Sequence, residues 1–137
     1  MENFRVAVKA FTVDGGKVLL VKRREDDVHK PDDWDIPGGR LGMGENPFEG
    51  LKREMHEETG IGIDILLPFH VQHFTRDDGQ KITMIIFLCR PLSAEVRLSH
   101  EHHDHMWVPL QDKNAFPKWL HPAIDAYFRY GLDRFSG

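Results

Sequence analysis

The chain has 137 residues, of which 40% are hydrophobic and 29% are charged, a balance typical of a globular protein with a real core. This length suits one compact domain, so we expect a single domain over residues 1–137. The formal charge of −4 excludes a strongly basic protein that attracts nucleic-acid polymers or anionic membranes by its overall field.

The chain begins with an expected hairpin. Val6–Val13 is apolar enough to predict a strand, and Lys17–Val21 predicts a second one. Between them, Asp14-Gly15-Gly16 favours a tight turn, because glycines accept the positive φ that such turns need. Lys22–Asp33 is polar and contains a proline, which indicates an exposed loop.

A glycine-rich segment then leads into a helix. Residues 34–46, WDIPGGRLGMGEN, hold too many glycines for a regular element. Asn46 is a good N-cap, Pro47 suits the first helical position, and Gly60 predicts the helix end. The expected apolar stripe of this helix consists of Phe48, Leu51 and Met55.

The second half adds strands and a closing helix. Ile61–Thr75 and Lys81–Arg90 predict strands joined by a turn at Asp77-Asp78-Gly79. The remaining expectations are a loop at Arg90–His105, a short strand at Met106–Leu110, a turn bracketed by Pro117 and Pro122, and a helix at Ala123–Leu132. The fold class is therefore α/β (α+β), with a mixed sheet between helices.

Three glutamates on the Pro47–Thr59 helix stand out. At about 100° per residue, Glu54, Glu57 and Glu58 fall within a wedge of about 100°, which we expect on a side away from the apolar stripe. Their like charges repel at spacings of three and four residues, near the negative end of the helix dipole. Most clusters of charged residues on a helix simply form a face that is exposed to solvent. A divalent cation would compensate the repulsion, and Mg²⁺ prefers carboxylates, water and phosphate oxygens.

The register of these residues resembles a known family. Gly39–Ile61, GRLGMGENPFEGLKREMHEETGI, is similar to the signature of Nudix hydrolases. The pattern is glycine, glutamate, arginine-glutamate, two glutamates and glycine at fixed spacings, with apolar positions between. Every position is met, by Gly39, Glu45, Arg53, Glu54, Met55, Glu57, Glu58, Gly60 and Ile61. The resemblance implies an α/β/α sandwich and hydrolysis of a pyrophosphate bond by water.

The resemblance also implies roles for individual residues. Glu57 and Glu58 would be metal ligands, with the Gly38 carbonyl as a further ligand. Glu54 would ligate metal through water or take the proton of the attacking water, and Arg53 would orient it. Glu45 and Gly60 would support the site, and Gly39 would contact the substrate.

Two residues outside the signature are further candidates. In some relatives the general base is a glutamate ahead of a Trp-Val pair, and here Glu101 precedes Trp107-Val108. Whether Glu54 or Glu101 is the base stays open. Arg23 ends the second expected strand, where relatives often place an arginine that reaches substrate phosphates.

The segment His100–His105, HEHHDH, suggests a zinc site but lacks the spacing of one. Four residues after His100 stands Asp104, so the helical zinc motif with two histidines is not met. We expect an exposed, pH-sensitive loop that flanks the substrate. The only cysteine, Cys89, lies in an apolar run and is expected to be a buried, inert thiol.

The expected activity is a Mg²⁺-dependent hydrolysis, with Mn²⁺ as a possible substitute. The substrate class that the short chain favours is a nucleoside triphosphate, modified or not, cleaved to a monophosphate and pyrophosphate. ADP-ribose, nucleotide sugars and dinucleoside polyphosphates are the alternatives within the family. An isomerase on the same scaffold and a non-catalytic nucleotide-binding module are alternatives of another class.

The remaining expectations concern the location of the protein in the cell and its binding partners. The first residues carry Glu2, Arg5 and Lys9, which predicts no secretory signal. The longest apolar stretch, Ile82–Cys89, is too short to cross a bilayer. We therefore expect a cytoplasmic monomer or homodimer. Its expected partner is a small nucleotide substrate, and we expect it to bind neither nucleic-acid polymers nor membranes.

Overall fold

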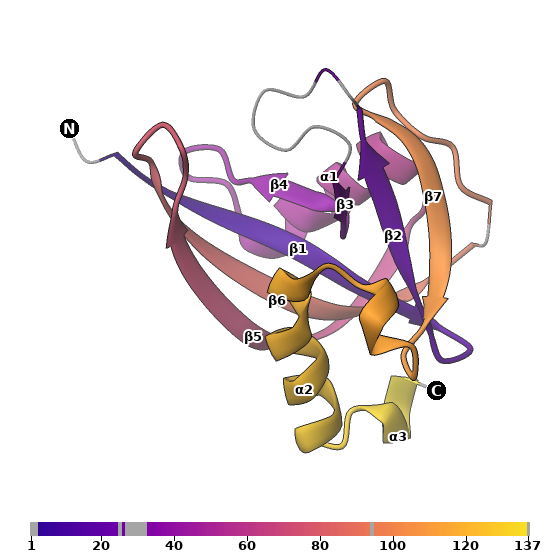
Figure 1. Ribbon diagram of the computed structural model, residues 1–137. Coiled ribbons are helices and arrows are strands. Elements are labelled where there is room, and N and C mark those ends of the chain that lie inside the picture. The colour runs from indigo at the N-terminus through magenta and orange to yellow at the C-terminus, as the bar shows by residue number, and fades with distance from the viewer. Residues whose placement is uncertain (1–2, 25, 27–32, 94, 137) are drawn as a thin grey trace.

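The computed structural model describes residues 3–24, 26, 33–93 and 95–136, and it is a mixed sheet with a helix on each face (Figure 1). The described strands are β1 (Phe4–Asp14), β2 (Lys17–Arg23), β3 (Trp34–Asp35), β4 (Gly38–Arg40), β5 (Ile63–Thr75), β6 (Lys81–Pro91) and β7 (His102–Pro109). The helices are α1 (Pro47–Thr59), α2 (His121–Arg129) and α3 (Asp133–Ser136), with 3₁₀ turns at Lys113–Ala115 and Lys118–Leu120.

The long strand β1 lies at the centre of the sheet. It pairs with β6 in parallel and, at its end, with β2 in an antiparallel hairpin, so the order is β3-β2-β1-β6-β5. The short strand β4 pairs with the middle of β1, and β7 pairs with β2. The mixed sheet between helices confirms the fold class that the sequence predicts.

Alternation along β1 divides the core between the two helices. Val8 and Ala10 face α1, where Leu51 and Met55 are fully buried. Ala7 and Phe11 face the other way, into a cluster that includes Tyr127 of α2. Successive strand residues point to opposite faces, so one strand serves both cores.

Several expected elements agree with the structure and others need correction. The Pro47–Thr59 helix has the bounds that its caps predict, and the Asn46 side chain accepts hydrogen bonds from the Phe48 and Glu49 amides. The glycine-rich segment contains two short strands, β3 and β4, which the sequence analysis missed because pairing with β1 and β2 overrides its poor local propensity.

The end of the chain also differs from expectation. Strand β7 begins at His102 rather than Met106, because it pairs with β2 as far as Arg23. Pro122 lies inside the first turn of α2 instead of before it, where the missing N–H costs nothing. Most of the expected 22–33 loop, residues 25 and 27–32, falls outside the described residues. No helix in the described parts of the chain is long and apolar enough to span a membrane.

Candidate active site

A cleft of about 920 Å³ runs over one face of β1 and past β4 to the carboxylates of α1. It brings together most of the residues that the sequence singles out, although they come from five elements and loops. Those lining it are Arg23, Gly38, Gly39, Glu45, Arg53, Glu54, Glu57 and Glu101. Glu58 lies beneath the cleft wall, and Gly60 ends α1.

Glu54 lies directly against the backbone of β4. A Cβ atom added to Gly39 would come within 2.8–2.9 Å of the Glu54 carboxylate. Only a glycine therefore lets that carboxylate sit against the strand. The Glu54 side chain keeps 17% of its surface exposed, so its oxygens still reach the cleft.

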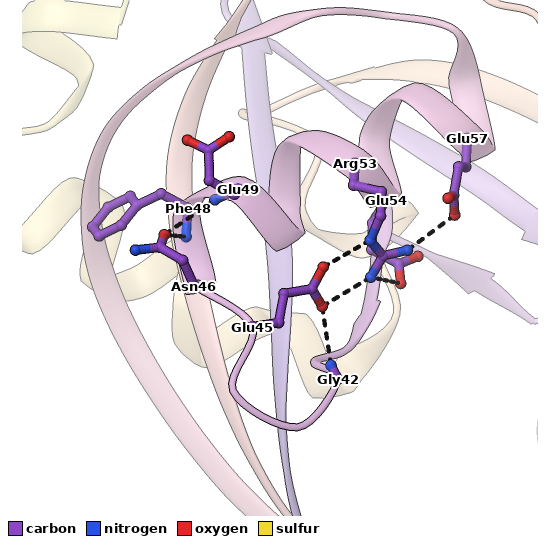
Figure 2. A network of polar contacts seen from close by, with 8 residues as sticks. All are labelled: Gly42, Glu45, Asn46, Phe48, Glu49, Arg53, Glu54 and Glu57. Carbon is purple, nitrogen blue, oxygen red and sulfur yellow. Dashed lines mark hydrogen bonds and ion pairs between the residues drawn. The ribbon is translucent and has the colours of Figure 1, made fainter.

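Arg53 holds three carboxylates at once, as Figure 2 shows. Its Nε and Nη2 donate to the two oxygens of Glu45 at 2.8 and 3.0 Å. Nη2 also donates to Glu54 at 3.2 Å, and Nη1 donates to Glu57 at 3.1 Å. The Gly42 amide donates to Glu45 at 3.0 Å, which ties the loop before α1 to the same network. The Arg53 bonds and the Gly42 amide together lower the pKa of Glu45 to about 2.

Glu58 occupies a different environment from the other two glutamates. It is 5% exposed, and its carboxylate accepts a hydrogen bond from the Gly38 amide at 3.0 Å. Burial raises its pKa above the usual value, and the nearby Glu54 adds to that rise, whereas Lys9 opposes it. Two carboxylates so close together, one of them desolvated, form a place where a cation is electrostatically favoured.

The expectation that all three glutamates avoid the apolar face is wrong for Glu58. Glu58 follows Leu51 by seven residues, or two helical turns, so both point toward the sheet and both are buried. Glu57 is the outward member, with 57% of its side chain exposed. The three glutamates therefore extend from the protein interior at Glu58 to the exposed surface at Glu57.

The carboxylate chemistry fits a magnesium ion, although no three acidic, histidine or cysteine groups converge as a ready-made cage in the described residues. Magnesium commonly takes only one or two protein carboxylates and fills its octahedron with waters and substrate phosphates. Glu54 and Glu57 line the cleft, and the buried Glu58 is bonded to the amide of Gly38, which also lines it. Gly38 and Gly39 bring backbone groups to the same wall.

A buried pair of opposite charges lies in the cleft floor and was missed by the sequence analysis. The Lys9 ammonium donates to the Asp35 carboxylate at 3.0 Å and to the Ile36 carbonyl at 3.3 Å. Arg23 reaches the same carboxylate at 3.6 Å. The available signal was Lys9 itself, a single charge in the apolar run VAVKAF, since such a charge is seldom buried without a partner.

The histidine-rich segment is partly the expected exposed loop, because His100 and Glu101 form an exposed turn, but from His102 onward it is strand β7. Glu101 is exposed and lines the cleft, but the next residue, His102, is only 3% exposed. The His102 Nε2 lies 3.6 Å from the Glu58 carboxylate. Pairing of β7 with β2 turns this side chain inward, which the spacing of the histidines does not reveal.

The far wing of the cleft is also absent from the sequence analysis. Arg5, Arg40 and Arg76 surround a floor of Ala7, Ile82 and Met84. Phe74 lines this wing with 37% of its surface exposed. Phe87 and Phe116 are buried as core residues.

Known proteins match the chain over most of its length. A family model described as the NUDIX domain matches residues 3–129. The nucleoside triphosphatase NudI of Escherichia coli K12 is 30% identical over 118 residues, which cover 79% of this chain and 84% of that protein. A MutT-like protein of Streptomyces ambofaciens is 27% identical over 69% of this chain, which spans 56% of that protein's length.

A solved structure agrees with the fold as well. The crystal structure of a MutT protein from Methanosarcina mazei Go1 superposes with a TM-score of 0.84 and 28% sequence identity. The superposition covers 94% of this chain and 96% of that chain. The likeness therefore extends over nearly the whole fold.

Proposed function

The chain belongs to the Nudix hydrolase family, and from that membership we propose that it hydrolyses nucleoside triphosphates to monophosphates and pyrophosphate with Mg²⁺. Nudix hydrolases are pyrophosphohydrolases that act on small nucleotides and generally need divalent metal ions. The choice of triphosphates rests on the relative NudI, a nucleoside triphosphatase, of which the alignment covers 84%.

The observation that carries the proposal is the network around Arg53. One guanidinium fixes Glu45, Glu54 and Glu57, all three of these residues line the cleft, and Glu54 lies beside Gly39. A preorganised set of carboxylates needs no rearrangement when it receives a cation and a phosphate. Arg53 is a positioning residue in this scheme, because its donors are occupied by glutamates.

The metal ion would be held by Glu57 and Glu58, with Glu54 and the Gly38 carbonyl as further ligands. When bound, it would neutralise charge on the phosphates and lower the pKa of a coordinated water. Arg23, at the end of β2, would hold a phosphate oxygen of the substrate, and the Gly39 backbone would contact the same group. Asp35, which accepts a hydrogen bond from Lys9, lies 3.6 Å from Arg23 and would help to orient it.

The general base is either Glu54 or Glu101, and both line the cleft. The proposal favours Glu54, because its carboxylate is fixed between Arg53 and Gly39, whereas Glu101 lies on an exposed turn. The base would take the proton of the attacking water as the bond to phosphorus forms and the bond to the leaving pyrophosphate breaks.

A substrate screen tests the activity. Purified protein is assayed with nucleoside triphosphates, ADP-ribose, a nucleotide sugar and a dinucleoside polyphosphate, each with Mg²⁺ or Mn²⁺. We expect the highest kcat/KM for a triphosphate, with pyrophosphate and monophosphate released in equal amounts. Preference for any of the other three classes, or release of single phosphate from the triphosphate, contradicts the proposal.

The pH profile of two variants identifies the base. Glu54→Gln should remove the acidic limb of the kcat profile as well as lowering kcat, while Glu101→Gln should leave that limb in place. The reverse result assigns the base to Glu101 and leaves the substrate proposal intact.

A further inference from the structure

The far wing of the cleft carries positive charge that the catalytic network does not use. It lies where the start of β1 meets β4 and the β5–β6 hairpin (Figure 1). The wing is defined here by Arg5, Arg40 and Phe74 around the Ala7, Ile82 and Met84 floor. Arg40 occupies a variable position of the signature segment Gly39–Ile61, the others lie outside that segment, and none is among the site residues proposed above.

Strand register places the two arginines on one face. Arg40 pairs with Ala7 across the β1–β4 ladder, and Arg5 is two residues from Ala7. Residues two apart on a strand share a face, so Arg5 and Arg40 are diagonal neighbours about 7–8 Å apart. Ile82 pairs with Arg5 on one side and with Phe74 on the other, which completes the row.

The two arginines share one cleft with the catalytic carboxylates. Arg5, Arg40, Glu54 and Glu57 all line it. Arg40 follows Gly39 on β4, and a Cβ atom on Gly39 would meet the Glu54 carboxylate. This arrangement suits a substrate whose negative charge continues beyond the bond that is cleaved.

The charge of Arg5 and Arg40 has no acidic counterpart in the described residues. Arg5 donates to the Phe4 carbonyl at 2.9 Å, and Arg40 donates to the Gln80 side-chain oxygen at 2.7 Å. Neither makes an ion pair with a carboxylate of the described chain. Arg76, by contrast, is held by both oxygens of Asp78 and adds little net charge. The wing thus carries an uncompensated charge of about +2 at neutral pH.

Arg40 is held ready for a ligand. Gln80 is only 7% exposed, and its side-chain oxygen fixes one Arg40 nitrogen, which leaves the other donors of the guanidinium for a ligand. A fixed guanidinium loses less side-chain entropy on binding and matches two phosphate oxygens at once.

We propose that Arg5 and Arg40 bind the terminal phosphates of the substrate, the part that leaves as pyrophosphate. This inference rests on the proposed function and makes it more specific. The arginines, which only donate, suit phosphate oxygens better than the hydroxyl groups of a neutral sugar. They would therefore select triphosphates over nucleotide sugars and over ADP-ribose.

The test compares two variants that remove one positive charge from the same edge of the sheet. Arg5→Gln removes charge inside the wing. Lys81→Gln is the control, because exposed Lys81 adjoins Ile82 on β6 and points to the opposite face. Two quantities are measured for each: kcat/KM for a nucleoside triphosphate and for a nucleotide sugar, and the affinity for inorganic pyrophosphate in magnesium buffer by calorimetry.

For Arg5→Gln we expect a loss of roughly tenfold in kcat/KM for the triphosphate and in pyrophosphate affinity, as for one charge-assisted hydrogen bond. Activity on the nucleotide sugar should stay within about twofold, and Lys81→Gln should change neither quantity. Arg5→Lys should recover part of the loss, since it keeps the charge but not the planar fork. The Arg5→Gln/Arg40→Gln double variant should lose more than either single variant.

Four results overturn the inference. They are an equal loss on both substrates, an equal loss in Lys81→Gln, a loss of kcat/KM for the triphosphate with unchanged pyrophosphate affinity, and no change at all. These four results can be told apart from a failure of the proposed triphosphate hydrolysis. If the wild type hydrolyses no triphosphate but binds pyrophosphate in an Arg5-dependent way, the anion site stands and the proposed activity is wrong.

Discussion

At the scale of single residues, the three glutamates of α1 differ in exposure, and this difference predicts different consequences of mutation. Glu57 is mostly exposed and bonded to Arg53, Glu54 is half-buried against Gly39, and Glu58 is buried under Gly38. An exposed carboxylate adds little to stability, because water screens its ion pair. Its role should therefore show in activity.

Glu57→Gln should lower kcat by about a hundredfold or more, since the loss of an indirect contact to a metal already costs about 10–100-fold. The free energy of unfolding without metal should change little, because the lost ion pair to Arg53 is exposed and repulsion from Glu54 is relieved. Steady-state kinetics and urea unfolding measure the two effects. Glu49→Gln, in the first turn of the same helix, is the control, and turnover near that of the wild type in Glu57→Gln would rule out the metal-ligand assignment.

Gly39→Ala should impair catalysis while the protein remains folded. The added methyl group would meet the Glu54 carboxylate at 2.8–2.9 Å, so the carboxylate must move from its place beside Arg53. A shift of this kind should lower kcat by about tenfold or more. Gly42→Ala is the matched control, because its new Cβ would lie 3.7 Å from Glu45, an ordinary contact. Equal activity of the two variants would show that the Gly39–Glu54 contact does not matter.

At the scale of elements, side chains connect the site to the strands and to the loop before α1. Glu45 ties that loop to the helix through Arg53 and Gly42. Lys9 of β1 and Asp35 of β3 join two strands that are not neighbours in the sheet order. Both links come from residues far apart in sequence or on separate elements.

The Glu45 link should give a defined pH dependence. Its pKa is lowered from 4.5 to about 2, so the folded state favours the ionised form. Its contribution to stability is therefore fully present above about pH 4.5 and is lost as the pH falls toward 2. Urea unfolding of the wild type and Glu45→Gln should differ at pH 6, and the difference should shrink by pH 3. A difference that grows on acidification would contradict the ionised Glu45–Arg53 pair.

The Lys9–Asp35 pair should behave as a buried, coupled unit. Asp35→Asn leaves the buried Lys9 ammonium without its carboxylate and should cost about 3–5 kcal/mol of unfolding free energy. Lys9→Met should cost less, because Arg23 still lies 3.6 Å from the Asp35 carboxylate. The double variant should cost clearly less than the sum of the two, with a coupling of about 0.5–3 kcal/mol. A double-mutant cycle by urea unfolding measures this coupling, and strict additivity would show that the pair makes no net interaction.

At the scale of the whole molecule, the fold is built independently of the metal ligands. The two cores lie on opposite faces of the sheet, and Glu58 is the one proposed carboxylate ligand among the buried residues. The protein should therefore keep its far-ultraviolet circular dichroism in EDTA while losing activity. Adding Mg²⁺ should restore activity and raise Tm modestly, in proportion to how far its concentration exceeds Kd. Loss of structure in EDTA would show that the metal is part of the fold.

The sequence predicted much of the architecture because its local signals agree with the tertiary structure. The caps at Asn46 and Gly60 define α1, and Gly15-Gly16 and Gly79 define the hairpins. Strands β3, β4 and the first half of β7 were missed because each is short or polar and is stabilised by its partner strand. Strand propensity depends on such context more than helix propensity does.

The spacing of Gly39, Glu45, Arg53, Glu54, Glu57 and Glu58 by itself determined the family and the reaction class, because a helix converts fixed spacing into fixed directions. Only the tertiary structure decided that Glu58 is buried, that Lys9 meets Asp35, and that Arg5 and Arg40 share one wing of the cleft. These contacts join residues of different strands. Strand register and sheet order set which of them meet, and no local pattern encodes either.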